Sequence, residues 1–156
     1  MFKNTKIISI LFISVILVSC GYTKISQKNN LFSFESINIE GNKRIAYTIR
    51  NDLILISNTK AQDKYNIEIK LEKSKSNKIK DKAGNVTRYA VNIKSKLVIK
   101  NYNNEIIAGK NFSTNVDYDV AENHSDTISN ERNATRVATQ LSSEKITSYV
   151  NILFLN

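Results

Sequence analysis

The sequence contains no proline and no tryptophan, and only four glycines, one cysteine and one histidine among 156 residues. A single histidine excludes metal sites built from several histidines, and it excludes multi-histidine catalysis. The glycines stand alone, which excludes a glycine-rich loop that cradles phosphate groups. With one cysteine the chain cannot form an internal disulfide, so we expect its fold to rest on hydrophobic burial alone.

Residues 1–19 have the pattern of a secretory signal peptide. Lys3 and Lys6 are the only charged residues before Cys20, and an apolar run over residues 7–18 follows them. A basic start, a short apolar stretch and a small residue at the cut site define such a signal. The run falls short of the ~20 residues that a membrane-spanning helix needs. We therefore interpret it as a cleaved signal rather than a retained anchor.

The apolar run ends in a lipobox, Leu17-Val18-Ser19-Cys20. The thiol of Cys20 is the nucleophile that takes up a diacylglycerol, and small Ser19 leaves the bond before Cys20 open to a peptidase. The freed amine then accepts a further acyl chain, and two or more chains anchor a protein stably. We prefer this interpretation to a buried core cysteine. It predicts a lipid anchor on Cys20 and no other cofactor, and Gly21 in place of Asp favours the outer membrane.

The expected mature chain is a tether over residues 20–30 followed by a single domain over residues 31–156. Loss of Lys3 and Lys6 with the signal lowers the formal charge from +9 to +7. A basic exported domain suits anionic lipid, lipopolysaccharide, peptidoglycan or an acidic partner. Export argues against a nucleic acid as the partner.

Hydropathy periodicity predicts an α+β fold. Alternating apolar residues predict strands at 31–39, 65–71, 89–99 and 106–120, and stripes at helical spacing predict helices at 43–57 and 127–153. The β-α-β-β-β-α order predicts a two-layer sandwich, with two helices on one face of a four-stranded, mainly antiparallel sheet. The apolar phase slips between Phe34 and Ile37, which indicates a bulge or a strand buried on both faces. Asn42 is the expected N-cap of the first helix.

No set of residues suggests an enzyme. His124, Ser125 and Asp126 are adjacent in an expected loop, without the nucleophile elbow of a serine hydrolase. Asp117 and Asp119 fall on the solvated side of a strand. They could bind a cation weakly, but we favour a solvated face and predict no metal site.

A lysine-rich stretch over residues 73–88 is the main feature outside the expected core. It is either an extended pair of strand ends or a long hairpin connection. Its charge has two interpretations, a solvated hairpin or a tip that binds an anionic ligand. Lysine supplies point charges suited to phosphate, without the bidentate geometry of arginine.

Several of these features resemble the lipopolysaccharide-assembly lipoprotein family, LptE. Cys20-Gly21-Tyr22 resembles the Cys-Gly-aromatic start of its mature members. Residues 127–134 (Thr-Ile-Ser-Asn-Glu-Arg-Asn-Ala) are similar to the opening of the final helix in the alphaproteobacterial branch, and residues 136–141 to its continuation. The predicted element order over residues 31–153 is similar to the fold of the family.

The resemblance implies a non-enzymatic lipoprotein on the periplasmic side of the outer membrane. Members of the family sit inside the outer-membrane β-barrel LptD, help it to assemble, and help to deliver lipopolysaccharide to the outer leaflet. The alternative is a lipoprotein activator of a periplasmic enzyme such as a peptidoglycan synthase. The tether over residues 21–30 spans at most ~35 Å, which favours a partner at the membrane.

The resemblance also implies a site for lipopolysaccharide. The family has a contacting basic residue just before a glycine of the hairpin, and Lys82 matches this position, with Lys80 and Arg88 as neighbouring candidates. A second basic position, in the loop before the last helix, is not matched, because residues 122–124 read Glu-Asn-His.

Overall fold

The computed structural model describes residues 32–155, which form a four-stranded sheet and two helices. The elements follow the predicted order β-α-β-β-β-α, so the predicted fold class is confirmed. The predicted signal peptide, Cys20 and the tether lie outside the described residues.

The sheet is mixed and its strands are ordered β1-β2-β3-β4. Their bounds are Phe32–Glu40 for β1, Asp63–Lys80 for β2, Val86–Lys100 for β3 and Ile106–Asp119 for β4. β1 pairs with β2 in parallel because a helix crosses between them, whereas the hairpins β2–β3 and β3–β4 are antiparallel. The register of β1 shifts between Phe34 and Ser36, which agrees with a bulge, the first of the two predicted alternatives.

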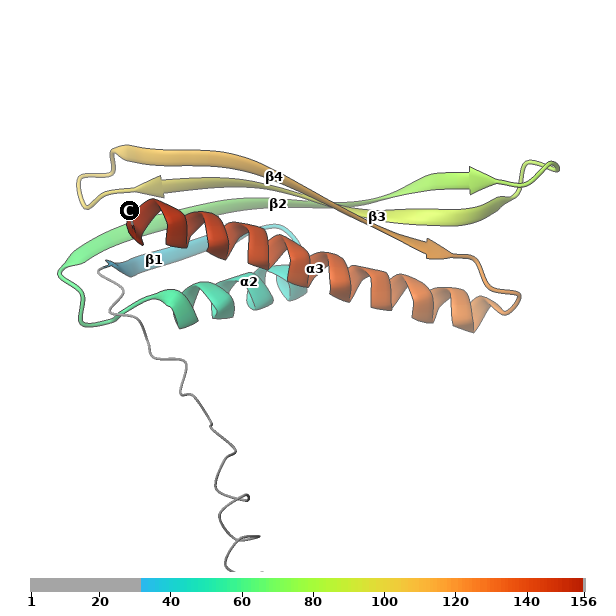
Figure 1. Ribbon diagram of the computed structural model, residues 1–156, viewed down its shortest axis with the longest axis horizontal. Coiled ribbons are helices and arrows are strands. Elements are labelled where there is room, and N and C mark those ends of the chain that lie inside the picture. The colour runs from blue at the N-terminus through green and yellow to red at the C-terminus, as the bar shows by residue number, and fades with distance from the viewer. Residues whose placement is uncertain (1–31, 156) are drawn as a thin grey trace, which may run out of the picture.

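Two helices, α2 (Lys43–Ile56) and α3 (His124–Leu155), cover one face of the sheet. α3 runs along β3 and β4, and α2 packs beside it beneath β1 (Figure 1). Asn42 is the N-cap of α2, as predicted, since its Oδ1 accepts from the backbone N–H groups of Arg44 and Ile45 at 3.1 and 3.3 Å.

The core lies between the sheet and the helices. It is built from the inward-facing residues of the strands and the apolar stripes of the helices, among them Phe32, Ile45, Ile49, Leu53, Ile67, Ile69, Val91, Ile93, Leu97, Ile99, Ala138, Ile146 and Val150. The opposite face of the sheet carries the alternate, polar residues of each strand. Where both helices cover the sheet, one face is therefore buried and the other is solvated.

The start of α3 differs from its prediction. α3 begins at His124 rather than at Thr127, because the N–H of Thr127 already bonds the carbonyl of Asn123 at 3.1 Å. The lysine-rich stretch follows the first of its two predicted alternatives, since it consists of extended strand ends joined by a short turn over residues 81–85. Polar residues do not stop these strands, because pairing across the hairpin satisfies the backbone groups that face the partner strand, and most of the side chains are exposed.

Candidate functional site

The turn between β2 and β3 is organised by Asp81. One carboxylate oxygen accepts from the N–H groups of Ala83 and Asn85, both at 2.9 Å, and the other accepts from the Asn85 amide at 3.2 Å. These hydrogen bonds, those of Asn85 foremost, lower the pKa of Asp81. Gly84 supports the turn with a φ of 89°. The tip is therefore a defined turn, and the carboxylate of its only acidic residue is occupied by hydrogen bonds within the turn.

Lys80 and Lys82 both lie at this tip. Lys80 ends β2 opposite Val86, and Lys82 lies in the turn itself. Both side chains are exposed, and neither forms a salt bridge or a side-chain hydrogen bond within the described chain. Their charges are open to an anionic ligand, as the sequence-based hypothesis requires.

Arg88 is placed differently. It faces Ile79 across the hairpin, and its Nε donates to Asp119 Oδ1 on β4 at 2.5 Å. Asp119 raises the pKa of the guanidinium, with a smaller contribution from Asp117. Arg88 is thus held in an ion pair on the polar sheet face, and the structure does not bring its charge to the tip.

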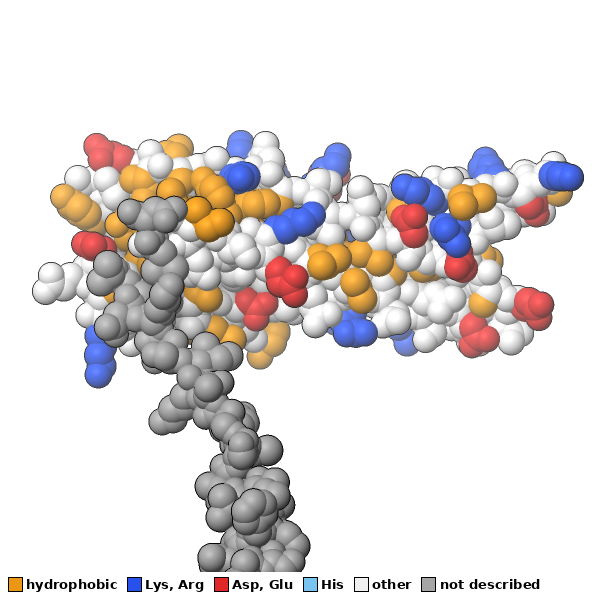
Figure 2. Space-filling model, viewed as in Figure 1, with side chains coloured by type: hydrophobic (Ala, Val, Ile, Leu, Met, Phe, Trp, Pro, Cys, Tyr) orange, Lys and Arg blue, Asp and Glu red, His pale blue; other side chains and the backbone are white. Residues whose placement is uncertain are grey.

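The two strand carboxylates also have cationic partners. Asp119 binds Arg88, and Asp117 lies 4.0 Å from Lys78 Nζ. Within residues 32–155 no cluster of three or more His, Cys, Asp or Glu side chains has the arrangement of a metal site. Figure 2 shows this intermixing of basic and acidic side chains at the hairpin end of the molecule.

A polar cluster beneath the hairpin stem escaped the sequence analysis. Tyr118 Oη donates to Glu131 Oε2 at 2.8 Å, and Lys75 Nζ lies 3.2 Å from the same oxygen. Lys75 also lies 4.5 Å above the ring of Tyr89, which stacks on Tyr118 at 5.7 Å. The bond from Tyr118, and then Lys75, lowers the pKa of Glu131. The cluster joins α3 to β2, β3 and β4, and we assign it a structural role.

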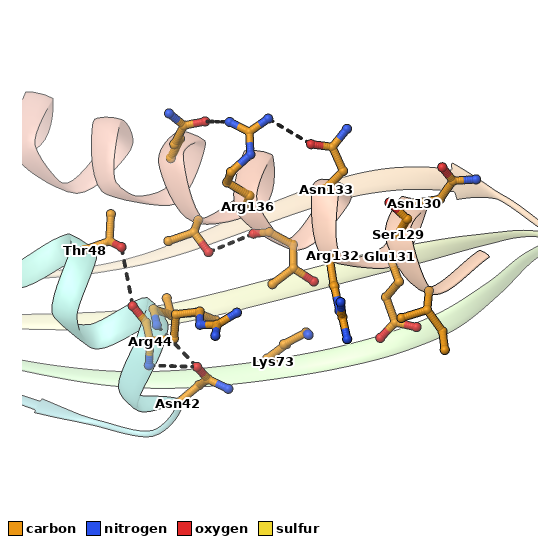
Figure 3. Close-up of a pocket in the computed structure, with 15 residues that line it drawn as sticks. Asn42, Arg44, Thr48, Lys73, Ser129, Asn130, Glu131, Arg132, Asn133 and Arg136 are labelled. Atoms are coloured by element: carbon orange, nitrogen blue, oxygen red, sulfur yellow. Dashed lines mark hydrogen bonds between the residues drawn. The ribbon is translucent and has the colours of Figure 1, made fainter. Parts of the chain in front are cut away.

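A groove of about 1060 Å³ opens between the start of α2, β2 and α3. Three basic side chains reach into it from three different elements, Arg44 from α2, Lys73 from β2 and Arg132 from α3 (Figure 3). Lys73 belongs to the lysine-rich stretch described from the sequence, whereas neither arginine is among the site residues predicted there. No local signal joins them, because about 90 residues separate the two arginines in the chain.

The candidate catalytic set around His124 does not form. His124 is the exposed first residue of α3 rather than a loop residue, and Ser125 and Asp126 follow it in the helix. Consecutive residues on a helix do not face one another. None of the helices within residues 32–155 is long and apolar enough to cross a membrane.

Comparisons with known proteins find likeness in structure only. No protein family matches the sequence, and no curated protein is detectably related to it. Among solved structures, the fold is similar to rare lipoprotein B from Shewanella oneidensis, with a TM-score of 0.58 and 14% identity over 80% of this chain and 96% of that one.

Two further solved structures share the fold. A minor lipoprotein from Acinetobacter baumannii has a TM-score of 0.60 and 10% identity, covering 80% of this chain and 94% of its own. An uncharacterized lipoprotein B from Nitrosomonas europaea has a TM-score of 0.57 and 11% identity, covering 75% and 83%. At such identities the likeness shows a shared fold.

Proposed function

We propose that this chain is an outer-membrane lipoprotein, anchored through Cys20, that plugs and helps to assemble an LptD-like β-barrel and assists lipopolysaccharide delivery to the outer leaflet. The observation that carries the proposal is the coincidence of two independent features. The apolar leader of the sequence ends in a lipobox. The domain that follows it shares its fold with solved bacterial lipoproteins, rare lipoprotein B among them. The lipobox plays no part in the structural likeness, so each feature supports the other.

The dimensions of the hairpin suit a protein that lies inside a barrel. β2 is 18 residues long, which at about 3.3 Å per residue amounts to roughly 60 Å. This exceeds the ~30 Å of a bilayer hydrocarbon core, so the hairpin is long enough to pass through a barrel lumen. Its uncovered sheet face is polar and bears both signs of charge, and the lumen of a wide barrel is polar as well.

The tip is the proposed contact with lipopolysaccharide. Lys80 and Lys82 are exposed and have no acidic partner within the described residues. Lysine ammonium groups bind phosphate as point charges, which suits a ligand whose phosphates vary in position. Arg88 would join the contact only by leaving Asp119, so we assign it a secondary role.

The deciding experiment is affinity purification of the tagged lipoprotein from detergent-solubilised outer membranes, followed by mass spectrometry. We expect a large β-barrel protein in equal amount. An untagged strain and an unrelated tagged lipoprotein serve as controls for carry-over. Recovery of a peptidoglycan synthase instead would favour the activator alternative, and recovery of neither would count against a plug.

A further inference from the structure

Part of the helical layer is missing beneath β2. α2 begins at Lys43 and runs back under β1, whereas α3 continues along the whole sheet (Figure 1). The pairing of β1 with β2 ends at Glu40 and Lys70, where the chain turns away at Gly41. From Glu72 to Lys80, β2 therefore has a strand neighbour on one side only among the described residues. Here the molecule has both an open strand edge and an uncovered groove.

The groove has an excess of positive charge. Within the described part of the chain, Arg44, Lys73 and Arg132 form no salt bridge. Arg136, at the groove wall, donates only to the neutral side chains of Asn133 and Gln140, at 2.8 and 3.3 Å. The one carboxylate among the lining residues belongs to Glu131, which already binds Tyr118 and Lys75. Such an excess attracts an anionic ligand.

A compact anion does not fit this site well. The start of α2 lines the groove, but Asn42 already satisfies the backbone N–H groups of Arg44 and Ile45. The lining is mostly neutral, and amide and hydroxyl side chains such as Thr48 and Asn130 accompany the cations (Figure 3). Spaced charges with hydrogen-bonding groups between them suit an extended polypeptide rather than a single phosphate group.

The open edge of β2 indicates which kind of polypeptide can bind beside the groove. An unpaired edge is a template for another strand. This stretch of β2 carries one acid, Glu72, and four lysines, of which Lys75 is paired with Glu131 of α3; the others are Lys73, Lys78 and Lys80. Two copies of the same basic edge would repel each other, whereas an acidic strand would be attracted.

We propose that an extended acidic segment of a partner protein binds here, pairing with the edge of β2 over residues 72–80 and placing its carboxylates beside Arg44, Lys73 and Arg132. The groove that holds these cations is distinct from the hairpin tip, although the edge of β2 ends at the tip residue Lys80. Binding of the segment requires neither lipopolysaccharide nor the barrel partner. Along an extended chain alternate side chains share one face, so a segment with acids at every second residue places all of them toward the cations.

The test is the binding of a fluorescein-labelled ten-residue peptide of alternating glutamate and threonine to the full mature lipoprotein in detergent micelles. Fluorescence anisotropy at low ionic strength should show saturable binding to the native protein. The double variant Arg44→Glu with Arg132→Glu should weaken it by about tenfold or more, as expected for losing two charge contacts. Glutamate in the first turn of α2 favours the helix, so position 44 should fold normally.

Arg50→Glu is the matched control. Arg50 lies on the same helix as Arg44 and is exposed, but it is not among the residues that line the groove. We expect its affinity for the peptide to stay within about twofold of the native protein, since a distant surface charge is screened. Equal losses in Arg50→Glu and the double variant would overturn the proposal, as would the absence of saturable binding.

Two further measurements separate strand pairing from other anion binding. Peptides N-methylated at their odd or their even residues lack opposite sets of N–H donors, and a paired strand uses only one set toward β2. Loss of binding in one peptide alone supports edge pairing, and equal behaviour of both contradicts it. Displacement of the peptide by inorganic pyrophosphate at equal concentration would identify a compact anion site and overturn the proposal.

Discussion

Tyr118 Oη donates a 2.8 Å hydrogen bond to Glu131 Oε2, which joins the last strand of the sheet to the last helix. Lys75 Nζ, from β2, lies 3.2 Å from the same oxygen. These contacts lie where the hairpin stem has α3 beneath it but no α2. The cluster adds a polar link between the hairpin stem and α3, beside buried core residues that include Val91 and Ala134.

Replacing Tyr118 with Phe should destabilise the domain. The ring would keep its stacking on Tyr89, while Glu131 would lose its shortest hydrogen bond. Hydrogen bonds to charged groups contribute about 1.5–3 kcal/mol, and partial exposure of Glu131 reduces this to about 1 kcal/mol. Urea unfolding measures the change. Tyr102→Phe, at an exposed turn, should leave the free energy of unfolding unchanged, and an equal loss there would refute the role of the bond.

The cluster should also make stability depend on pH. The hydrogen bond from Tyr118, and then Lys75, lowers the pKa of Glu131 in the folded protein. Its contribution is therefore complete above the pKa of an unfolded glutamate, and it is lost as the pH falls through the lower folded value. Urea midpoints measured from neutral to acid pH should fall less steeply in Glu131→Gln than in the native protein. Glu122→Gln, at an exposed position, should follow the native curve. The same flattening of the pH dependence in Glu122→Gln as in Glu131→Gln would contradict the assignment of the effect to Glu131.

Gly41→Ala should be strongly destabilising. Gly41 has a φ of 117°, and a Cβ there would lie 2.4 Å from the carbonyl oxygen of Leu71. Backbone strain of about 1–3 kcal/mol adds to this clash, so we expect a loss near 3 kcal/mol in urea unfolding. Gly84→Ala introduces the backbone strain without a close contact, so its loss should be smaller. Gly109→Ala introduces neither, because its nearest atom lies at 3.7 Å, so its loss should be the smallest of the three. Any other order of the three losses would contradict this explanation.

Reversing the two free charges at the hairpin tip should weaken lipopolysaccharide binding. Lys80→Glu with Lys82→Glu removes both ammonium groups and adds repulsion, so we expect a loss of about tenfold without unfolding. Binding of labelled lipopolysaccharide and circular dichroism measure the two effects. Lys60→Glu with Lys64→Glu is the matched control at the opposite end of the molecule (Figure 1). Unchanged affinity in the tip variant would mean that the tip is merely solvated.

Cys20→Ala should leave an unprocessed and mislocalised precursor, because the acyl-accepting thiol is gone. Labelling of cells with radioactive palmitate, followed by gel electrophoresis, should show a band for the native protein and none for the variant. Ser19→Ala keeps a small residue at the cut site and should be processed normally. Normal maturation of Cys20→Ala would remove the lipoprotein assignment.

Local patterns in the sequence determined the elements and the side each buries. The stripe of Ile45, Ile49 and Leu53 predicted the buried face of α2, and alternation from Ile67 to Leu71 predicted that of β2. Asn42 could be predicted as a cap and the β1 bulge from its slipped phase. These features depend on residues within one or two turns or strand steps, so the sequence suffices for them.

Only the tertiary structure decided which distant segments of the chain come into contact. The polar ends of β2 and β3 became strands because each satisfies the backbone of the other, which their own hydropathy does not indicate. Arg88 is held by Asp119, 31 residues away, and Glu131 is bound by Lys75, 56 residues away. The groove exists only because β1 stops at Glu40 while β2 continues to Lys80. A contact between segments depends on where the whole chain places them, and periodicity along one segment carries no information about the other.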